Sequence, residues 1–233
     1  MDSPISIAIE TTCRKGGVAL GAGDEPVDTL AFDARRRHAT LLIGKLDDLL
    51  ARRSLAPTDV DELYVSLGPG SFTGIRVGVT VARTFAQARP GLRCVGVPTP
   101  AAVAQNARHL DWMRLAHIHD AKDDRVHVTL FTREHPSQPP VQEGPSRVMS
   151  ESGFLESLDQ PTLLIGEGLG YHEFPSPHAT LADESLWLPT PAGVWAVGRR
   201  MARAGEFTEY HHLLPHYTRK PEAVRLWEQR EER

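Results

Sequence analysis

Residues 66–86, SLGPGSFTGIRVGVTVARTFA, join a short apolar strand to a long helix through a glycine-rich turn. The strand ends at Gly68-Pro69-Gly70, and the helix is expected from Gly74 to Ala88. Free N–H groups and the positive end of the helix dipole meet at such a junction, so Gly70 and Ser71 are candidate phosphate-binding residues. A tight turn with a helix cap is the alternative interpretation of the same residues.

Two common catalytic loops are excluded at this junction. A Walker A loop needs Gly-Lys followed by Ser or Thr, whereas Gly74 is followed by Ile75-Arg76. A nucleophile elbow needs glycines on both sides of its serine, and Pro69 and Thr73 stand at those positions around Ser71.

The expected helix carries a stripe of small residues at steps of four, formed by Gly74, Gly78, Ala82 and Ala86. Each glycine in a helix interior costs about 1 kcal/mol relative to alanine, so close packing must offset that cost. Either the helix packs tightly on its own sheet, or the stripe is a helix–helix interface with another chain. Its apolar residues cover more than one face of the helix, so both alternatives remain open.

Working outward from this stretch, the first 106 residues predict the order βββαβαβα. Alternating and helical hydrophobic spacing predicts strands at Ile5–Ile9, Val18–Leu20, Val27–Phe32, Leu63–Leu67 and Arg93–Val97, with helices from His38, from Gly74 and after Pro98. Thr99 is the expected N-cap of the third helix. Three antiparallel strands followed by alternating helices and strands predict a mixed sheet with helices on its faces.

The second half repeats this order more loosely. The expected elements are strands at Leu115–His119, Val126–Phe131, Arg147–Met149 and Thr162–Ile165, with helices at Ser150–Leu158 and Ala192–Ala204. The duplication predicts two lobes, residues 1–106 and residues 107–233, with no element assigned after Gly205.

Polar residues follow the first strand of each predicted lobe. Glu10, Thr11 and Thr12 end the first strand, and Asp120 holds the equivalent place in the second lobe. A carboxylate beside hydroxyls and turn amides suits a magnesium–phosphate site, so the first three residues are candidate nucleotide ligands. Polar residues at a strand end are the alternative. The glycines of the GxGxG loop at Gly166–Gly170 either let the backbone come close to a nucleotide or belong to a flexible loop.

Composition narrows the class of protein. The chain has 26 Lys and Arg against 30 Asp and Glu, a formal charge of −4, which argues against sequence-independent binding to nucleic acid or to anionic membranes. No signal peptide and no membrane span are expected. With two cysteines and no disulfide framework, the chain is predicted to be cytoplasmic.

Eleven histidines raise the question of a metal. His117 and His119 share one face of a strand, but no third histidine follows at a ligand spacing. Pro215 interrupts the helix that His212 and His216 would need. No bound metal is predicted.

Four segments resemble the bacterial TsaB family, also called YeaZ or glycoprotease-like. They are SIAIETTCRKGGVAL, RRRHATLLIGKLDDLL, SLGPGSFTGIRVGVTVARTFA and IHDAKDDRVHVTLF, and the late PHYTR resembles a C-terminal Pro-x-Tyr-x-Arg of that family. The resemblance implies an α/β, actin-like ATPase fold with two ribonuclease-H-like βββαβαβα lobes and mixed sheets. It also implies a non-catalytic subunit that helps the paralogue TsaD to make threonylcarbamoyladenosine next to the anticodon of tRNAs reading codons that begin with A.

The same resemblance implies a partner surface on the two helices of the first lobe, with contacts at His38, Leu42, Gly74, Arg76, Gly78 and Ala82. Expected partners are the TsaD-like paralogue and a TsaE-like ATPase, with a homodimer in isolation and tRNA reached only through the complex. No cofactor is expected on the chain alone, and ATP or ADP with magnesium is expected at the complex interface.

The actin-like phosphate motif normally carries Asp followed by Gly, and Glu10-Thr11-Thr12 departs from it, which argues against autonomous ATP hydrolysis. A stand-alone ATPase or kinase remains the first alternative, and a metallopeptidase the second.

Overall fold

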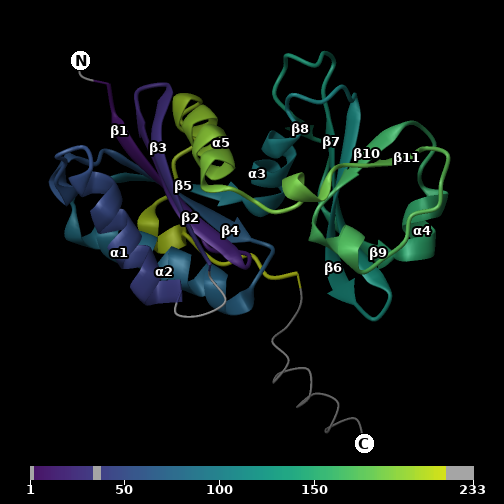
Figure 1. Ribbon diagram of the computed structural model, residues 1–233, viewed down its shortest axis with the longest axis horizontal. Coiled ribbons are helices and arrows are strands. Elements are labelled where there is room, and N and C mark those ends of the chain that lie inside the picture. Colours follow the sequence, from purple (N-terminus) through teal and green to yellow (C-terminus); the bar gives the residue numbers. More distant parts are fainter. Residues whose placement is uncertain (1–2, 34–37, 219–233) are drawn as a thin grey trace, which may run out of the picture.

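The computed structural model describes residues 3–33 and 38–218, with the side chains of residues 38 and 39 left out. Two mixed β-sheets lie next to each other, and helices cover their faces (Figure 1). In this described part of the chain, no helix combines the length and the apolar character needed to cross a membrane.

The first sheet has the order β3-β2-β1-β4-β5. Its strands are β1 (Ile5–Glu10), β2 (Lys15–Ala22), β3 (Glu25–Asp33), β4 (Glu62–Gly68) and β5 (Arg93–Pro98). Neighbours among β1, β2 and β3 are antiparallel, and β4 is parallel to both β1 and β5. Both faces of this sheet are buried, because Ile7 and Ile9 enter one core while Ala8 enters another on the opposite face.

The α-helices among the described residues are α1 (His38–Ala51), α2 (Phe72–Ala88), α3 (Thr99–Asn106), α4 (Glu151–Glu156) and α5 (Pro191–Arg203). Helices α1 and α2 cover one face of the first sheet, and α3 and α5 cover the other (Figure 1). The predicted cap of α3 is wrong by one residue. Pro98 is the N-cap, because the Thr99 hydroxyl accepts a hydrogen bond from the Gly68 amide (3.2 Å) instead.

The second sheet has the order β11-β10-β6-β7-β8, and β9 also pairs with β7. Its strands are β6 (Arg114–Lys122), β7 (Arg125–Thr132), β8 (Val141–Gln142), β9 (Arg147–Ser150), β10 (Thr162–Ile165) and β11 (Ala179–Leu181). Each sheet thus has a central strand with an antiparallel hairpin partner on one side and two parallel strands on the other. The predicted α/β class with two mixed-sheet lobes is confirmed. The second lobe differs from the first in one connection. Between β10 and β11 it has a short 3₁₀ helix at Glu167–Gly170, where the first lobe has the α-helix α2 between β4 and β5.

The end of the described chain packs on the first lobe. Helix α5 contacts all five strands of the first sheet, and Trp195 on α5 donates to Ser6 on β1 (2.8 Å). Beyond α5, the Thr208 amide bonds the Cys94 carbonyl (2.7 Å), and Leu213 is buried in the first core. The prediction that groups all of residues 107–233 with the second lobe does not describe this part, because the apolar face of α5 covers the first sheet.

The chain crosses between the lobes twice, and one side chain joins the two crossings. Asn106 ends α3 and donates to the carbonyls of Leu186 (3.0 Å) and Leu188 (2.7 Å). It also accepts from the Thr190 hydroxyl (3.1 Å), which lies directly before α5. The outgoing and returning segments are therefore held together at one point.

Candidate functional site

The turn after β1 holds the predicted carboxylate in a closed environment. Glu10 is fully buried. One of its oxygens accepts from the Thr12 amide and from the Thr12 hydroxyl (2.6 Å), and the other accepts from the Ser66 hydroxyl (2.6 Å). Burial raises the pKa of Glu10, and the hydrogen bonds from Ser66 and Thr12 partly oppose that rise. Both carboxylate oxygens are therefore engaged by the protein itself.

The glycine-rich loop packs directly against this turn. A Cβ added at Gly70 would lie 2.3 Å from the Thr12 carbonyl oxygen, and one added at Gly74 would lie 1.9 Å from the Thr11 carbonyl oxygen. The Ser71 amide bonds the Thr12 carbonyl (2.6 Å), and the Ser71 hydroxyl caps α2 by accepting from the Gly74 amide (3.2 Å). The structure brings together all five candidate nucleotide ligands, but the chain's own atoms fill the space between them. These residues do not fit a magnesium–phosphate group.

The small-residue stripe of α2 faces inward. Gly74, Gly78 and Ala82 are buried, and a Cβ at Gly78 would lie 2.4 Å from the Thr11 hydroxyl oxygen. That hydroxyl donates to the Gly74 carbonyl (2.8 Å). Of the two alternatives for the stripe, the structure therefore shows packing within the lobe.

This finding corrects the predicted partner contacts. Gly74, Gly78, Ala82 and Leu42 are covered by the chain itself, so a partner cannot touch their side chains or Cα atoms. Arg76 is exposed. The side chain of His38 lies outside the described residues.

The outer face of α1 and α2 exposes apolar side chains that the sequence did not single out. Leu41 is 37% exposed, Ile43 is 54% exposed and Phe72 is 39% exposed. A shallow hollow of about 360 Å³ lies on α2, lined by Phe72, Thr73, Arg76, Val77, Thr80 and Val81. The Arg76 guanidinium lies over the Phe72 ring (5.0 Å to its centre), and Tyr217 stacks on the same ring (4.8 Å between centres).

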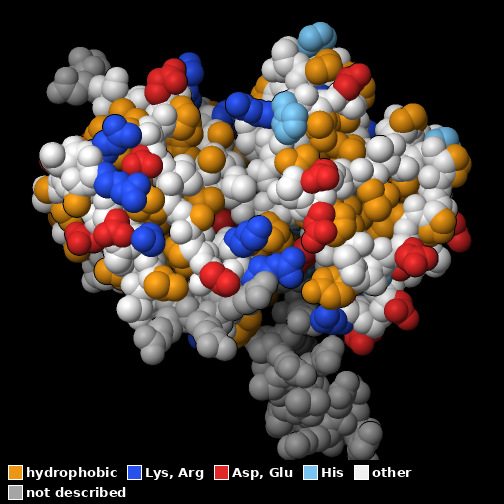
Figure 2. Space-filling model, in the orientation of Figure 1, with side chains coloured by type: hydrophobic (Ala, Val, Ile, Leu, Met, Phe, Trp, Pro, Cys, Tyr) orange, Lys and Arg blue, Asp and Glu red, His pale blue; other side chains and the backbone are white. Residues whose placement is uncertain are grey.

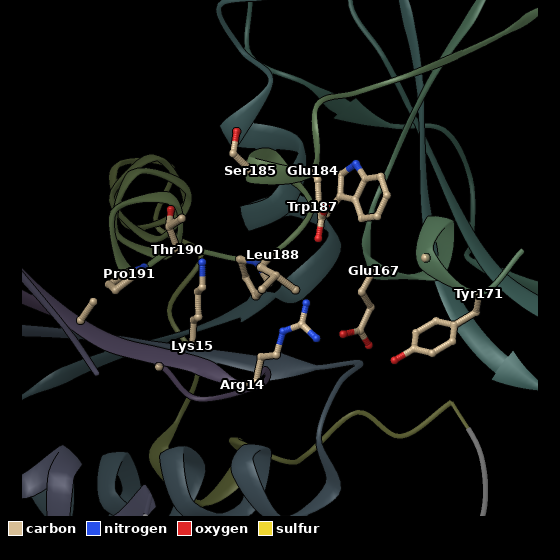
Figure 3. Close-up of a pocket in the computed structure, with 14 residues that line it drawn as sticks. Arg14, Lys15, Glu167, Tyr171, Glu184, Ser185, Trp187, Leu188, Thr190 and Pro191 are labelled. Carbon is tan, nitrogen blue, oxygen red and sulfur yellow. The ribbon is translucent and has the colours of Figure 1, made fainter. Parts of the chain in front are cut away.

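A larger pocket of about 430 Å³ opens between the lobes (Figure 3). Arg14 and Lys15 enter it from the first lobe, and Glu167 faces them from the second. On the surface drawn in Figure 2, basic and acidic side chains likewise meet at this junction. His119 forms an ion pair with Glu167 (3.0 Å), and its hydrogen bond holds the pKa of Glu167 below the usual range, with the charge of Arg14 adding to the effect. Trp187 also lines the pocket.

Sequence reasoning missed this pocket, although it marked both loops that form it. Arg14 and Lys15 come one residue after the marked Glu10–Thr12 turn, and Glu167 lies inside the GxGxG loop. The glycines of that loop allow close packing, since a Cβ at Gly166 would lie 2.3 Å from the Ile118 carbonyl oxygen. No local pattern marks Trp187, which reaches the pocket through the return crossing.

The carboxylate and the histidines of the second sheet are either paired with other side chains or buried. Asp120 pairs with Lys122 (2.5 Å) and with His172 (3.4 Å). His117 and His127 are buried on the second sheet, and burial lowers the pKa of each, His127 to about 4. Over residues 3–33 and 38–218, no three His, Cys, Asp or Glu side chains are grouped so as to hold a metal ion.

Comparisons with a family model and with curated proteins give consistent results over most of the chain. The family model of TsaD, tRNA N6-adenosine threonylcarbamoyltransferase, matches residues 32–132. The chain is 26% identical to the tRNA threonylcarbamoyladenosine biosynthesis protein TsaB of Bacillus subtilis, over 95% of this chain and 96% of that protein. It is 27% identical to TsaB of Escherichia coli, over 91% of this chain and 94% of that protein.

Solved structures agree with these relatives. A crystal structure from Pseudomonas aeruginosa, described as similar to peptidase YEAZ, superposes with a TM-score of 0.79 at 25% identity and covers 93% of this chain and 100% of that one. A structure of YeaZ from Pseudomonas aeruginosa gives a TM-score of 0.77 at 24% identity, over 92% of this chain and 99% of that one, which supports the fold. The TsaD model matches only part of the chain, whereas the TsaB relatives align over nearly all of it, so the chain resembles the TsaB (YeaZ) proteins over nearly its whole length.

Proposed function

We propose that this chain is a non-catalytic subunit of a complex that forms threonylcarbamoyladenosine in tRNA, and that it binds a TsaD-like catalytic partner. Two relatives that align over more than nine-tenths of their own length are named for this biosynthesis. The partial match to the TsaD model supports a partner of related architecture.

The closed Glu10 turn is the observation that carries the non-catalytic part of this proposal. A phosphate bound at the glycine-rich loop would have to displace the main chain of Thr11 and Thr12. A cation at Glu10 would have to break three hydrogen bonds in a fully buried site. In this proposal, Glu10, Thr12 and Ser66 stabilise the first lobe, and the partner carries out the transfer reaction.

The partner surface in this proposal is the outer face of α1 and α2, centred on Leu41, Ile43, Phe72 and Arg76. Exposed apolar side chains on two helices that pack together are a common basis for protein–protein contact. The same face would join two copies of the chain in the absence of the partner. A TsaE-like ATPase completes the complex, which we place in the cytoplasm, with ATP or ADP and magnesium at its interface.

The partner supplies the contact with tRNA in this proposal. A net charge of −4 and a fold with no basic arm among the described residues suit a subunit that reaches tRNA indirectly.

An exposed apolar residue on α1 gives the direct test. Ile43→Glu is expected to weaken the affinity for the TsaD-like protein of the same organism by about tenfold or more, because a charge would enter an apolar contact. The matched control is Val141→Glu on β8, where Val141 is 63% exposed and lies in the other lobe. Titration calorimetry on purified proteins measures both affinities.

A cellular readout tests the function itself. Depletion of the chain should lower the amount of threonylcarbamoyladenosine in digested bulk tRNA, and complementation by the Val141→Glu variant should restore it. Unchanged nucleoside levels after depletion, or steady ATP turnover by the purified chain alone, would contradict the proposed role.

A further inference from the structure

A second hollow, of about 320 Å³, lies between α2 and the segment that follows α5. It is lined by Arg76, Val79, Thr80, Arg83, Thr84, Gln87, Tyr210 and Pro215. The segment around Tyr210 contacts α2, and its yellow trace runs beside that helix in Figure 1. We call this hollow the Arg76–Arg83 groove.

The groove carries two positive charges that no carboxylate of the described residues neutralises. Among the described residues, neither Arg76 nor Arg83 has a carboxylate within ion-pair distance. Arg89, one turn beyond the groove, differs, since its guanidinium pairs with Asp61 (3.7 Å) and donates to the Thr58 carbonyl (2.7 Å). Within residues 3–33 and 38–218, Arg89 thus has a carboxylate partner, whereas the two arginines of the groove have none.

The polar groups of the groove form one stripe on the helix. Arg76, Thr80, Arg83 and Gln87 follow each other at steps of three and four residues, so their side chains share one face. At a rise of about 1.5 Å per residue, the Cα atoms of the two arginines lie about 10 Å apart along the helix axis. Hydroxyl and amide groups between and beyond the guanidiniums can complete the hydrogen bonds of a bound anionic segment.

The groove is continuous with the apolar hollow on the same helix. Arg76 and Thr80 line both, and the ring of Phe72 lies under the Arg76 guanidinium. A ligand that covers the whole face therefore needs apolar side chains along one edge and carboxylates along the other. A protein segment has both, whereas a nucleic-acid backbone supplies charge and buries little apolar surface.

We propose that the Arg76–Arg83 groove receives an acidic segment of the TsaD-like partner, with carboxylates about 10 Å apart that pair with the two guanidiniums. This inference rests on the proposed function and adds the chemistry by which the partner is recognised. The apolar hollow supplies buried contact, and the groove sets the register of the partner segment along α2.

Charge reversal tests the inference. Arg83→Glu and Arg76→Glu are each expected to weaken the affinity for the TsaD-like protein by about tenfold or more in titration calorimetry. Binding of the original chain should also weaken as the salt concentration is raised, and the Arg76→Glu/Arg83→Glu double variant should lose most of that salt dependence. Two single variants are used because Arg83 is half-buried and Arg76 is exposed; circular dichroism and thermal unfolding confirm that each folds.

Arg147→Glu is the matched control. Arg147 is exposed on β9 of the second lobe, and replacing it by glutamate changes the net charge by the same amount as Arg76→Glu or Arg83→Glu. The original chain is also titrated with bulk tRNA.

The outcomes separate this inference from the proposed function. If the original chain binds the TsaD-like protein and both reversals bind as tightly as the control, the groove assignment is overturned while the proposed function stands. If the original chain does not bind that protein, the proposed function fails. If the chain alone binds tRNA and the reversals abolish that binding, the groove is a nucleic-acid contact and the acidic-segment assignment is overturned.

Discussion

The carboxylate of Glu10 lies among hydrogen-bond donors within the first lobe. In the sequence, a carboxylate followed by two threonines at the end of a strand has the composition of a metal–phosphate site. In the fold, Thr12 turns back to donate twice to that carboxylate, and Ser66 on the neighbouring strand occupies its second oxygen. The same residue types therefore build a structural junction between β1, β4 and the loop before α2.

Substitution of Glu10 should affect stability rather than catalysis. Glu10→Ala leaves the Thr12 amide and two hydroxyls without their acceptor and opens a cavity, so it is expected to lower the free energy of unfolding by about 2–4 kcal/mol. Glu10→Gln keeps the shape and an acceptor oxygen, and it is expected to cost much less. Urea unfolding of the three proteins gives the comparison, and equal stability of the original chain and Glu10→Ala would contradict it.

The dependence on pH gives this prediction a sign. Because burial raises the pKa of Glu10 in the folded chain above its usual value of 4.5, the folded state binds the proton more tightly than the unfolded state. The stabilisation from Glu10 is therefore fully present below about pH 4.5 and is lost as the pH rises through the folded-state pKa. Relative to Glu10→Gln, the original chain should become less stable as the pH rises across this range.

At the scale of the element, α2 has two different faces. Its small-residue stripe meets the turn at Thr11 and lets the helix approach the sheet closely, and its opposite face presents apolar and basic side chains to solvent. The cost of glycine in the helix is offset within the lobe, and binding is left to the outer residues. The glycine of α1 contrasts with those of α2, since a Cβ at Gly44 has no atom within 4 Å.

The two helices give a matched pair of substitutions. Gly44→Ala on α1 is expected to raise the free energy of unfolding by about 0.5–1 kcal/mol, because alanine favours the helix and has room. Gly74→Ala on α2 is expected to lower it by about 2 kcal/mol or more, because its Cβ would lie 1.9 Å from a main-chain oxygen. Thermal and urea unfolding measure both. A stabilised Gly74→Ala variant would show that the turn at Thr11 moves freely.

At the scale of the whole molecule, the second lobe is inserted into the first. The chain leaves the first lobe after α3 and returns to it at α5. Because α3 and α5 pack against each other, the two crossings lie side by side. The Asn106 side chain bonds both crossing segments and so joins them to each other. The pocket that contains Arg14 and Glu167 lies between the same lobes.

Loss of this link should loosen the lobes without unfolding either one. Asn106→Ala removes three hydrogen bonds and is expected to lower the free energy of unfolding by about 1–3 kcal/mol and to speed proteolytic cleavage near Leu188. The control is Gln105→Ala, the neighbouring residue, for which no side-chain hydrogen bond is found in the described structure. Limited proteolysis with mass spectrometry locates the cut. Equal cleavage rates for the two variants would contradict the linking role.

Much of the candidate site could be located from the sequence, while its chemistry could not. Local pattern marks Glu10, Thr12, Gly70 and Ser71 as special, and the fold does bring them together. The sequence pattern does not distinguish a phosphate-binding loop from a loop that packs against another part of the chain. The main-chain atoms that pack against Gly70 and Gly74 belong to Thr11 and Thr12, about 60 residues away in the sequence. For the same reason, glycines spaced four residues apart on a helix indicate that another backbone packs closely against it, but not whether that backbone belongs to the same chain or to a partner.

The sequence by itself determined the elements of the first lobe, most of those of the second, their order and the resemblance to the TsaB family, because hydrophobic period and glycine-rich turns are local and the GPGSFTGIRVG block is specific. Only the tertiary structure decided which lobe receives α5, which face of α2 is exposed, and that the Glu10 turn is closed. These three depend on contacts between residues that are distant in the chain. The physical reason is that burial is a property of the packed molecule, and the same apolar or glycine-rich pattern is compatible with either of two partners until packing selects one.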